Sequence, residues 1–211
     1  MVARGGHQGG EDIDETSAKH LLDSIGEKVY KKVHGAALQR SNGALQGILS
    51  LATFEKKPET QQTPKDPCDL NHKYHTTVTS GYDKENPCKD RPEVRFSYTE
   101  GAECNKSKVK GNEGNSEGAC APYRRLHVCD QNLELIKPKN ITTHNLLVDV
   151  CLAAKFEAES LKTYRGKYQL TNHGFHTNIC TELARSFADI GDIIRGKDLY
   201  RGNNKEKDRL E

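Results

Sequence analysis

Seven cysteines follow residue 67 in a chain of 211 residues, and the first 67 residues contain none. The remaining composition is polar, since only 34% of residues are hydrophobic and the mean hydropathy is −0.84. A chain this poor in apolar side chains buries little core, so we expect its folded regions to depend on cross-links formed in an oxidising, extracellular setting. The disulfide candidates are Cys68, Cys88, Cys104, Cys120, Cys129, Cys151 and Cys180.

The number of cysteines is odd, so at least one has no partner within the chain. It is either a free thiol or the partner of a residue outside this sequence, and we expect about one thiol to remain free. The charged residues 205–211 are typical of a helix interrupted in mid-course, which predicts that the chain is a fragment. A bridge between Cys151 and Cys180 is disfavoured, because their distances from the intervening loop differ by roughly 15 Å in a simple helical hairpin.

The N-terminal 67 residues predict a helical arm between two irregular segments. Residues 1–15 are Gly-rich and polar, without the apolar run of a secretory leader. Thr16 or Ser17 is a suitable helix cap, and Gly35 is the expected end of the helix. The apolar residues of this helix lie on one face: Leu21, Leu22, Ile25, Val29 and Val33. A second amphipathic stretch, also expected to be helical, contains Leu45, Ile48, Leu49 and Ala52, and the three prolines of residues 56–67 predict a linker or an extended strap.

Residues 68–140 form a cysteine-rich, turn-rich region. Residues 76–79 and 94–98 are candidates for short strands. Residues 101–118 contain hardly an apolar side chain and predict an exposed loop.

The chain then changes to helical periodicity, which predicts two long amphipathic helices joined by residues 166–176. The predicted buried stripe of the first contains Leu147, Cys151, Ala154, Ala158 and Leu161. That of the second contains Cys180, Leu183, Phe187, Ile190 and Ile194. Each stripe therefore includes a cysteine.

Three apparent catalytic or metal-binding signals lack the context that they require. Ser116 lies in a G-x-S-x-G pattern, but no buried strand precedes it. Residues 191–197 have the spacing of a phosphate-binding loop, but Asp198 replaces the Ser or Thr that would hold magnesium. The histidine pairs His72/His75 and His173/His176 have no further ligands nearby and are interpreted as surface residues. We therefore predict no enzyme activity, metal or cofactor.

Two motifs carry a specific resemblance. Residues 120–134, CAPYRRLHVCDQNLE, and residues 184–196, ARSFADIGDIIRG, resemble the alpha subclass of Duffy-binding-like adhesion domains of malaria parasites. Residues 150–157 agree with the same family, and the helical arm resembles the segment that precedes such a domain. The chain is identified as similar to the head of Plasmodium falciparum erythrocyte membrane protein 1.

The resemblance implies a mainly α, disulfide-stabilised Duffy-binding-like adhesion fold. Residues 1–67 would be the N-terminal segment, a helical arm packed on the domain behind it. Residues 68–140 would be the irregular first subdomain, and residues 141–211 the first helices of an incomplete helical bundle.

The resemblance also implies cytoadherence or rosetting, in an antigenically variable protein exported to the outer face of the infected erythrocyte membrane. The expected partners are a host receptor protein, an anionic or blood-group glycan on red cells or endothelium, and antibodies. A membrane anchor would lie downstream of these residues. The alternative is a structural or shielding scaffold, with binding carried by a neighbouring domain.

Basic clusters supply candidate ligand-binding residues, because sulfated glycans and acidic receptors attract several cations at once. The candidates are Lys28, Lys31, Lys32, Lys106, Lys108 and Lys110. The alternative for each cluster is an ordinary solvated surface. Arg124 and Arg125 lie between two cysteines, and we expect at least one of them to form a structural ion pair. Nucleic-acid binding is disfavoured, because the net charge is only +2 and aromatic residues make up 6%.

Overall fold

A computed structural model describes residues 16–54, 63–78, 86–89, 91, 95–96, 101–112, 118–137, 139, 141–175 and 177–201. The chain forms two compact units, Met1–Gln46 and Gly47–Glu211. The domain boundaries expected at residues 67 and 140 remain a prediction.

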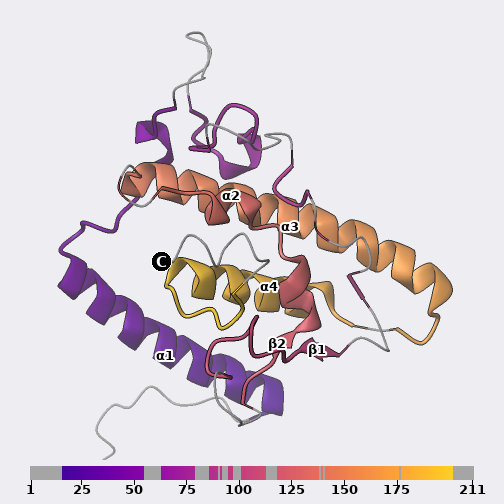
Figure 1. Cartoon of the computed structure of the whole chain (residues 1–211). Coiled ribbons are helices and arrows are strands. Elements are labelled where there is room, and N and C mark those ends of the chain that lie inside the picture. The colour runs from indigo at the N-terminus through magenta and orange to yellow at the C-terminus, as the bar shows by residue number, and fades with distance from the viewer. Residues whose placement is uncertain are drawn as a thin grey trace, which may run out of the picture. The chain divides into compact units, whose positions relative to one another are not determined.

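The first unit contains one helix, α1 (Ala18–Ser41), among its described residues (Figure 1). The Ser17 side chain accepts a hydrogen bond from the His20 N–H, as the capping pattern predicted. The predicted end at Gly35 was wrong, since the helix continues to Ser41 and is capped by Asn42, whose φ of 45° is left-handed. A single glycine within a helix costs only about 1 kcal/mol, which the surrounding residues offset.

The second unit begins close to its longest helix, α3 (Thr143–Thr171). A Cβ atom on Gly47 would lie 2.8 Å from the Leu147 Cβ, so only glycine fits here without a shift. The Asn145 side chain accepts a hydrogen bond from the Thr53 N–H (3.3 Å) and donates one to the Thr53 carbonyl (2.5 Å). Residues 49–51 form one 3₁₀ turn instead of the predicted amphipathic helix, because these contacts to α3 hold the backbone extended on either side.

The other elements of the second unit are short, except for α4 (Ile179–Ile194), which packs against α3 (Figure 1). Strands β1 (Ala102–Glu103) and β2 (Ala121–Pro122) pair antiparallel. The one-turn helix α2 (Gln131–Glu134) contacts α3. The described residues also include the 3₁₀ turns Leu49–Leu51, Pro67–Asp69 and Tyr123–His127.

The strands expected within residues 76–79 and 94–98 do not form in the described parts of those segments. Thr76 and Thr77 instead turn their hydroxyl groups to the Asp149 carboxylate, at 2.9 and 2.6 Å. A strand ladder needs a neighbouring backbone, whereas these residues find their partner in a helix side chain.

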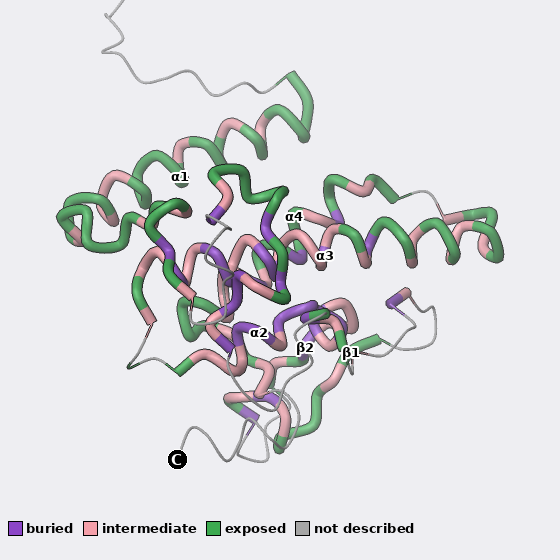
Figure 2. The backbone as a smooth tube through the Cα atoms, turned by 90° about the horizontal axis from the view of Figure 1, so that it is seen from above, coloured by how far each residue is buried: buried purple, intermediate pink, exposed green. Residues whose placement is uncertain are grey.

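Two small apolar clusters lie on different sides of α3, in which buried, intermediate and exposed residues are mixed (Figure 2). The first cluster contains Ala52, Leu70, Val148 and Leu152. The second contains Val128, Leu133, Ala153 and Ile190. The helix is therefore the common wall of both clusters.

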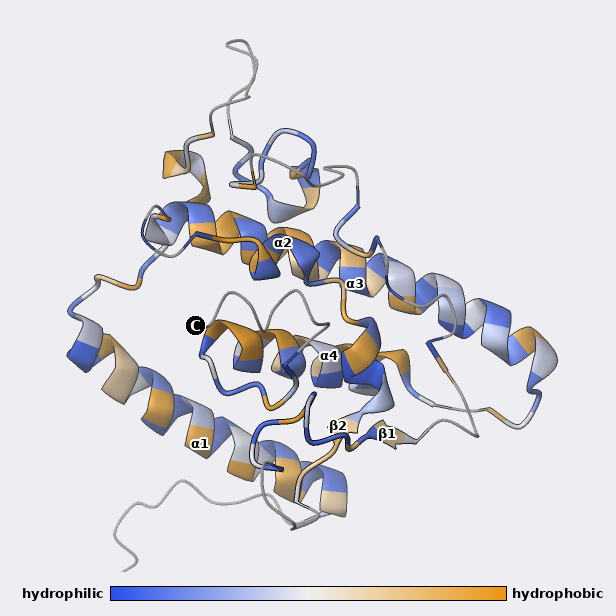
Figure 3. Ribbon diagram, in the orientation of Figure 1, coloured by the Kyte–Doolittle hydropathy of each residue, from blue (hydrophilic) through white to orange (hydrophobic). Residues whose placement is uncertain are grey.

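The buried faces of α3 and α4 are both partly polar, and the two predicted apolar stripes were only partly correct. Leu161 and Ile190 are buried as predicted, but Cys151 is half-buried and Cys180 is exposed. Phe187 and Ile194 are 42% and 40% exposed. Polar residues occupy much of the interior face instead: Asn145, Asp149, Glu157, Glu182 and Ser186. Figure 3 shows hydrophilic and hydrophobic residues mixed along α3, so apolar periodicity alone did not locate its buried side.

Candidate functional site

The segment between Cys120 and Glu134 is organised by buried arginines. Arg125 is 5% exposed, and its Nε and Nη2 donate to the Asp198 carboxylate at 2.9 and 2.6 Å. Its Nη1 lies 2.9 Å from Asp130 Oδ2. Burial by itself would lower the pKa of this guanidinium, but the carboxylates of Asp130 and Asp198 outweigh that effect and raise it. Arg125 is therefore a permanently charged structural residue.

The neighbouring arginines follow the same rule. Arg124 forms an ion pair with Asp189 at 2.9 Å, and Arg91 contacts Asp130 and Glu134. The Arg91 Nε also donates to the Val128 carbonyl at 3.0 Å. The expected structural role of an arginine in this motif is thus confirmed.

Cys129 is held from two directions. Its sulfur is bonded to Cys88, and its N–H donates to Glu157 at 3.1 Å. The other carboxylate oxygen of Glu157 lies 2.5 Å from Arg95 Nη2, and both side chains are at most 3% exposed. This ion pair and the disulfide fix the cysteine-rich segment on α3.

A second disulfide joins Cys104 to Cys120 and closes a loop at the β1–β2 ladder. All seven cysteines are described, and the remaining three have free thiols: Cys68, Cys151 and Cys180. The structure therefore leaves three thiols where the sequence predicted about one.

Three of the candidate lysines lie in the loop that this disulfide closes. Val109, between Lys108 and Lys110, is fully buried and forms an isolated β-bridge with Tyr200. The Lys110 N–H donates to the Leu199 carbonyl at 2.8 Å, and the Lys108 carbonyl accepts from Arg201 at 2.7 Å. The expectation of a fully exposed loop was wrong here, because one buried valine and these backbone bonds anchor the segment.

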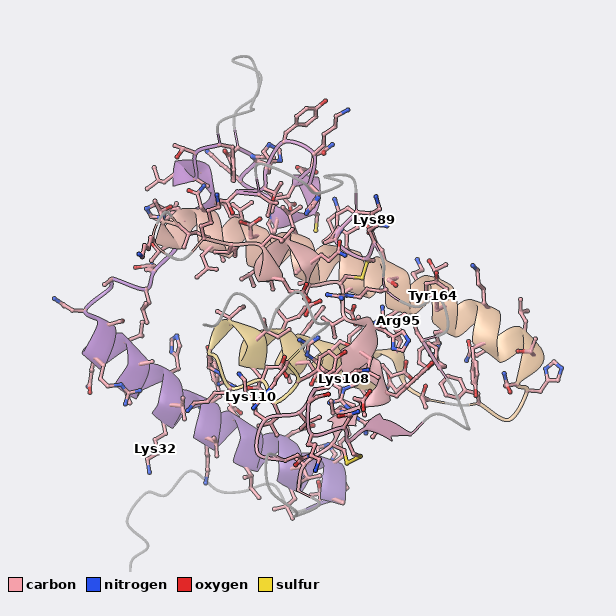
Figure 4. The ribbon with its side chains drawn as sticks, in the orientation of Figure 1. Lys32, Lys89, Arg95, Lys108, Lys110 and Tyr164 are labelled. Carbon is pink, nitrogen blue, oxygen red and sulfur yellow. A yellow bond between two sulfur atoms is a disulfide. The ribbon has the colours of Figure 1, made fainter. Side chains whose placement is uncertain are left out.

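The three lysines differ in exposure and in their ion-pair partners (Lys108 and Lys110 are labelled in Figure 4). Lys108 donates to Glu103 at 2.9 Å, and this hydrogen bond raises the lysine pKa and lowers the pKa of the carboxyl group. Lys106 is exposed and Lys110 is partly exposed. Val109, which lies between Lys108 and Lys110, is fully buried, whereas the two lysines are each partly exposed.

The other three candidates lie on α1. Lys28 and Lys32 are one helical turn apart and lie on the same side of the helix, with Lys32 exposed (Figure 4). Lys31 contacts Glu27 at 3.1 Å, with both side chains more than half exposed. Such an exposed ion pair contributes little stability, so an anionic ligand can readily displace Glu27 from Lys31.

The structure describes only some of the residues in the catalytic and metal-binding patterns that the sequence analysis rejected. Ser116 and His176 lie outside the described residues. Asp198 contacts Arg125, so the loop that resembles a phosphate site is tied to a structural cation. The interpretation of His72 and His75 as surface residues was wrong, since both are buried and pack edge-on against Phe156 and Phe54. No group of three potential metal ligands occurs in the described part of the chain.

Comparisons with known proteins agree on one family. The model of the Duffy binding domain matches residues 118–211, and the model of the N-terminal segments of PfEMP1 matches residues 17–53. The structure is similar to the N-terminal NTS-DBL1-alpha and CIDR-gamma double domain of PfEMP1 from the Plasmodium falciparum varO strain, with 38% identity and a TM-score of 0.66. The chain belongs to the PfEMP1 family.

A second similar structure is the DBLb domain of a PfEMP1 protein bound to human ICAM-1, with 27% identity and a TM-score of 0.64. These matches cover 83% and 85% of the present chain, which in turn spans 26% and 41% of the matched chains. No curated protein sequence gives a significant match. The mainly α, disulfide-containing fold predicted for this PfEMP1 chain is confirmed.

Sequence reasoning missed the buried carboxylates that stabilise the second unit of this PfEMP1 chain. Asp149 is fully buried, and burial raises its pKa, while hydrogen bonds from Thr77 and Thr76 partly oppose that effect. The sequence did contain a signal for this site, since a carboxylate lies among the apolar residues of a predicted helix. A carboxylate that is buried there requires hydrogen-bond donors from other segments. Among the described residues, no helix has the length and apolar character needed to cross a bilayer.

Proposed function

We propose that this chain is part of a host-cell adhesin that binds a host receptor protein or an anionic glycan through exposed lysines. Membership of the PfEMP1 family is the observation that carries the proposal. A domain of the same family is known in complex with a human cell-surface protein, ICAM-1. The whole protein would act at the outer face of the infected erythrocyte membrane, where it would be variable and exposed to antibodies.

The surface chemistry supports an anionic ligand for the lysine segment of residues 106–110. The backbone bonds of Lys108 and Lys110 to residues 199–201 hold two cationic side chains on an ordered segment. Preorganised cations bind an anion with less loss of conformational entropy than mobile ones. Lys106 and Lys110 are the best placed for contact, because Lys108 already contacts Glu103.

The arm lysines supply a second cationic group of the same kind. Lys28 and Lys32 share one side of α1, and sulfate groups along a glycan attract several cations at once. Each cationic group is tested separately by its own pair of substitutions.

The first experiment measures binding of heparin, ICAM-1 and intact red cells to the chain as a function of salt. Saturable binding that weakens steeply with salt is expected, since exposed charges are screened over ~8 Å at physiological ionic strength. Binding that appears only when the neighbouring domain is attached would favour the scaffold alternative. Binding that ignores salt would exclude the lysine mechanism.

Charge reversal then locates the contact. Lys28→Glu with Lys32→Glu, and separately Lys106→Glu with Lys110→Glu, should each weaken heparin binding about tenfold or more, equivalent to ~1.4 kcal/mol. Matched controls carry the same change in net charge elsewhere: Lys19→Glu with Arg40→Glu on α1, and Lys162→Glu with Lys167→Glu on α3. Equal losses in test and control variants would indicate non-specific attraction.

A further inference from the structure

Lys155 connects α3 to the segment that carries Cys68. Its Nζ donates to the carbonyl of Cys68 at 2.8 Å and to the carbonyl of Leu70 at 3.0 Å. These two bonds span 87 and 85 residues of sequence. They hold the backbone of the 3₁₀ turn Pro67–Asp69 against one place on the helix.

That place is the turn that carries Cys151. Side chains of an α-helix lean toward its N-terminus, so a residue covers the turn formed by residues three and four positions before it. Cys151 is four positions before Lys155, within α3. The Cys68 carbonyl bound to Lys155 therefore lies beside the Cys151 turn.

A second contact brings the same two segments together independently of the lysine. Cys151 packs against the apolar cluster that contains Leu70, Val148 and Leu152. Leu70 is 2% exposed and is only two residues from Cys68. Cys151 thus faces the segment of Cys68 by apolar packing, while Lys155 fixes the backbone of that segment.

We propose that Cys68 and Cys151 form a third disulfide, which binds the cysteine-rich segment covalently to α3. Both thiols are free in the structure, and Cys68 is exposed, so its side chain is able to turn toward the half-buried Cys151. The two disulfides already present require oxidising conditions, and the same conditions oxidise a third neighbouring pair. The two existing disulfides use four cysteines and the proposed disulfide uses two more. Cys180 would then be the single free thiol.

The oxidation balances with a small-molecule disulfide such as glutathione disulfide. The exposed Cys68 thiolate attacks one sulfur of glutathione disulfide and releases one glutathione thiolate. The Cys151 thiolate then attacks the Cys68 sulfur of the mixed disulfide and releases the second glutathione. The Asp66 carboxylate raises the pKa of the Cys68 thiol, and burial raises that of Cys151, so bridge formation should accelerate with rising pH.

Tryptic mapping separates the three thiols, because each lies in its own peptide. Cys68 is expected in residues 66–73, Cys151 in residues 140–155 and Cys180 in residues 168–185. The 211-residue chain is equilibrated with a glutathione redox buffer, alkylated without reduction and digested. The expected product is peptide 66–73 joined to peptide 140–155 with the loss of two hydrogen atoms, and alkylated Cys180.

Serine variants give a second readout that does not depend on recovering the joined peptide. With the third bridge, the parent has one thiol, C68S and C151S have two each, and C180S has none. Without it, the parent has three and every single variant has two. The parent and C180S therefore distinguish the two cases, and retention of the Cys88–Cys129 and Cys104–Cys120 peptides shows that a variant has folded.

Three thiols in the oxidised parent, or a bridge from Cys180 to either of the other cysteines, would overturn the proposal. A C180S variant with two titratable thiols would overturn it equally. None of these outcomes depends on ligand binding, so the adhesion proposal is tested separately.

Discussion

Arg125 and Asp198 are 73 positions apart in the sequence and are joined by two hydrogen bonds of 2.9 and 2.6 Å. Asp198 directly precedes the segment whose backbone pairs with Lys108 and Lys110. The Arg125 guanidinium also lies 5.3 Å from the centre of the Tyr200 ring. A buried arginine of the family motif thereby determines where the candidate ligand-binding lysines lie.

Breaking this pair should destabilise the fold. Asp198→Asn leaves the buried Arg125 with Asp130 as its one charged partner among the described residues, and we expect a loss of about 2–4 kcal/mol in the free energy of unfolding. Asp192→Asn is the matched control, since Asp192 pairs with Arg195 on the surface and should contribute less than about 0.5 kcal/mol. Urea unfolding measures both, and equal effects would contradict a structural role for Asp198.

Glu157 should be far more important than its neighbour Glu159 on α3. Glu157→Ala removes the only ion-pair partner that Arg95 has in the described structure, and two other Arg95 nitrogens have no acceptor there. The expected cost is about 3–5 kcal/mol, because a buried charge is left uncompensated. Glu159→Ala, at an exposed position, should change stability by less than about 0.5 kcal/mol. Thermal unfolding of both variants makes the comparison, and a tolerated Glu157→Ala would show that this site accommodates the charge.

The Cys104–Cys120 disulfide should order the lysine segment more than it stabilises the whole fold. Replacing both cysteines with serine opens a loop of 16 residues, which corresponds to at most about 3 kcal/mol of lost stability. The Val109–Tyr200 bridge would then be the main remaining anchor of the segment. Limited trypsin digestion should cleave after Lys106 or Lys108 faster than in the parent, and an unchanged cleavage rate would contradict this role.

Acid should destabilise the fold through His127. The ring is 2% exposed, and burial lowers its pKa below the ordinary value of about 6.5. Below about pH 6.5 the unfolded state therefore binds a proton that the folded state does not bind. The contribution of His127 to the free energy of unfolding is complete above that pH and is lost as the pH falls toward the pKa of the folded state.

The measurement for His127 is the difference in melting temperature between about pH 7.5 and about pH 5.5, on either side of the ordinary histidine pKa. His127→Phe keeps a ring beside Tyr123 but cannot be protonated, so it should lose part of the pH dependence seen in the parent. The contributions of the other titrating groups cancel when the pH-induced change in the parent is compared with that in the variant. An identical pH dependence in both proteins would show that His127 does not titrate as described.

Local sequence determined the features that depend on a few consecutive residues. The Ser17 cap, the existence of α3 and α4, and the structural arginines of the 120–134 motif were all predicted correctly. Each depends on helical periodicity, on a capping side chain three residues from the N–H that donates to it, or on a recognisable motif. The disulfide-rich, mainly α class followed from the same signals.

Tertiary structure alone decided which side of α3 is buried and which cysteines pair. The interior face contains Asp149 and Glu157, whose partners Thr76, Thr77 and Arg95 lie at least 62 residues away. Helical periodicity counts apolar residues, so it cannot recognise a carboxylate that becomes favourable inside only when distant donors arrive. The anchoring of Lys108 and Lys110 likewise depends on a backbone pairing with residues 199–201, for the same physical reason.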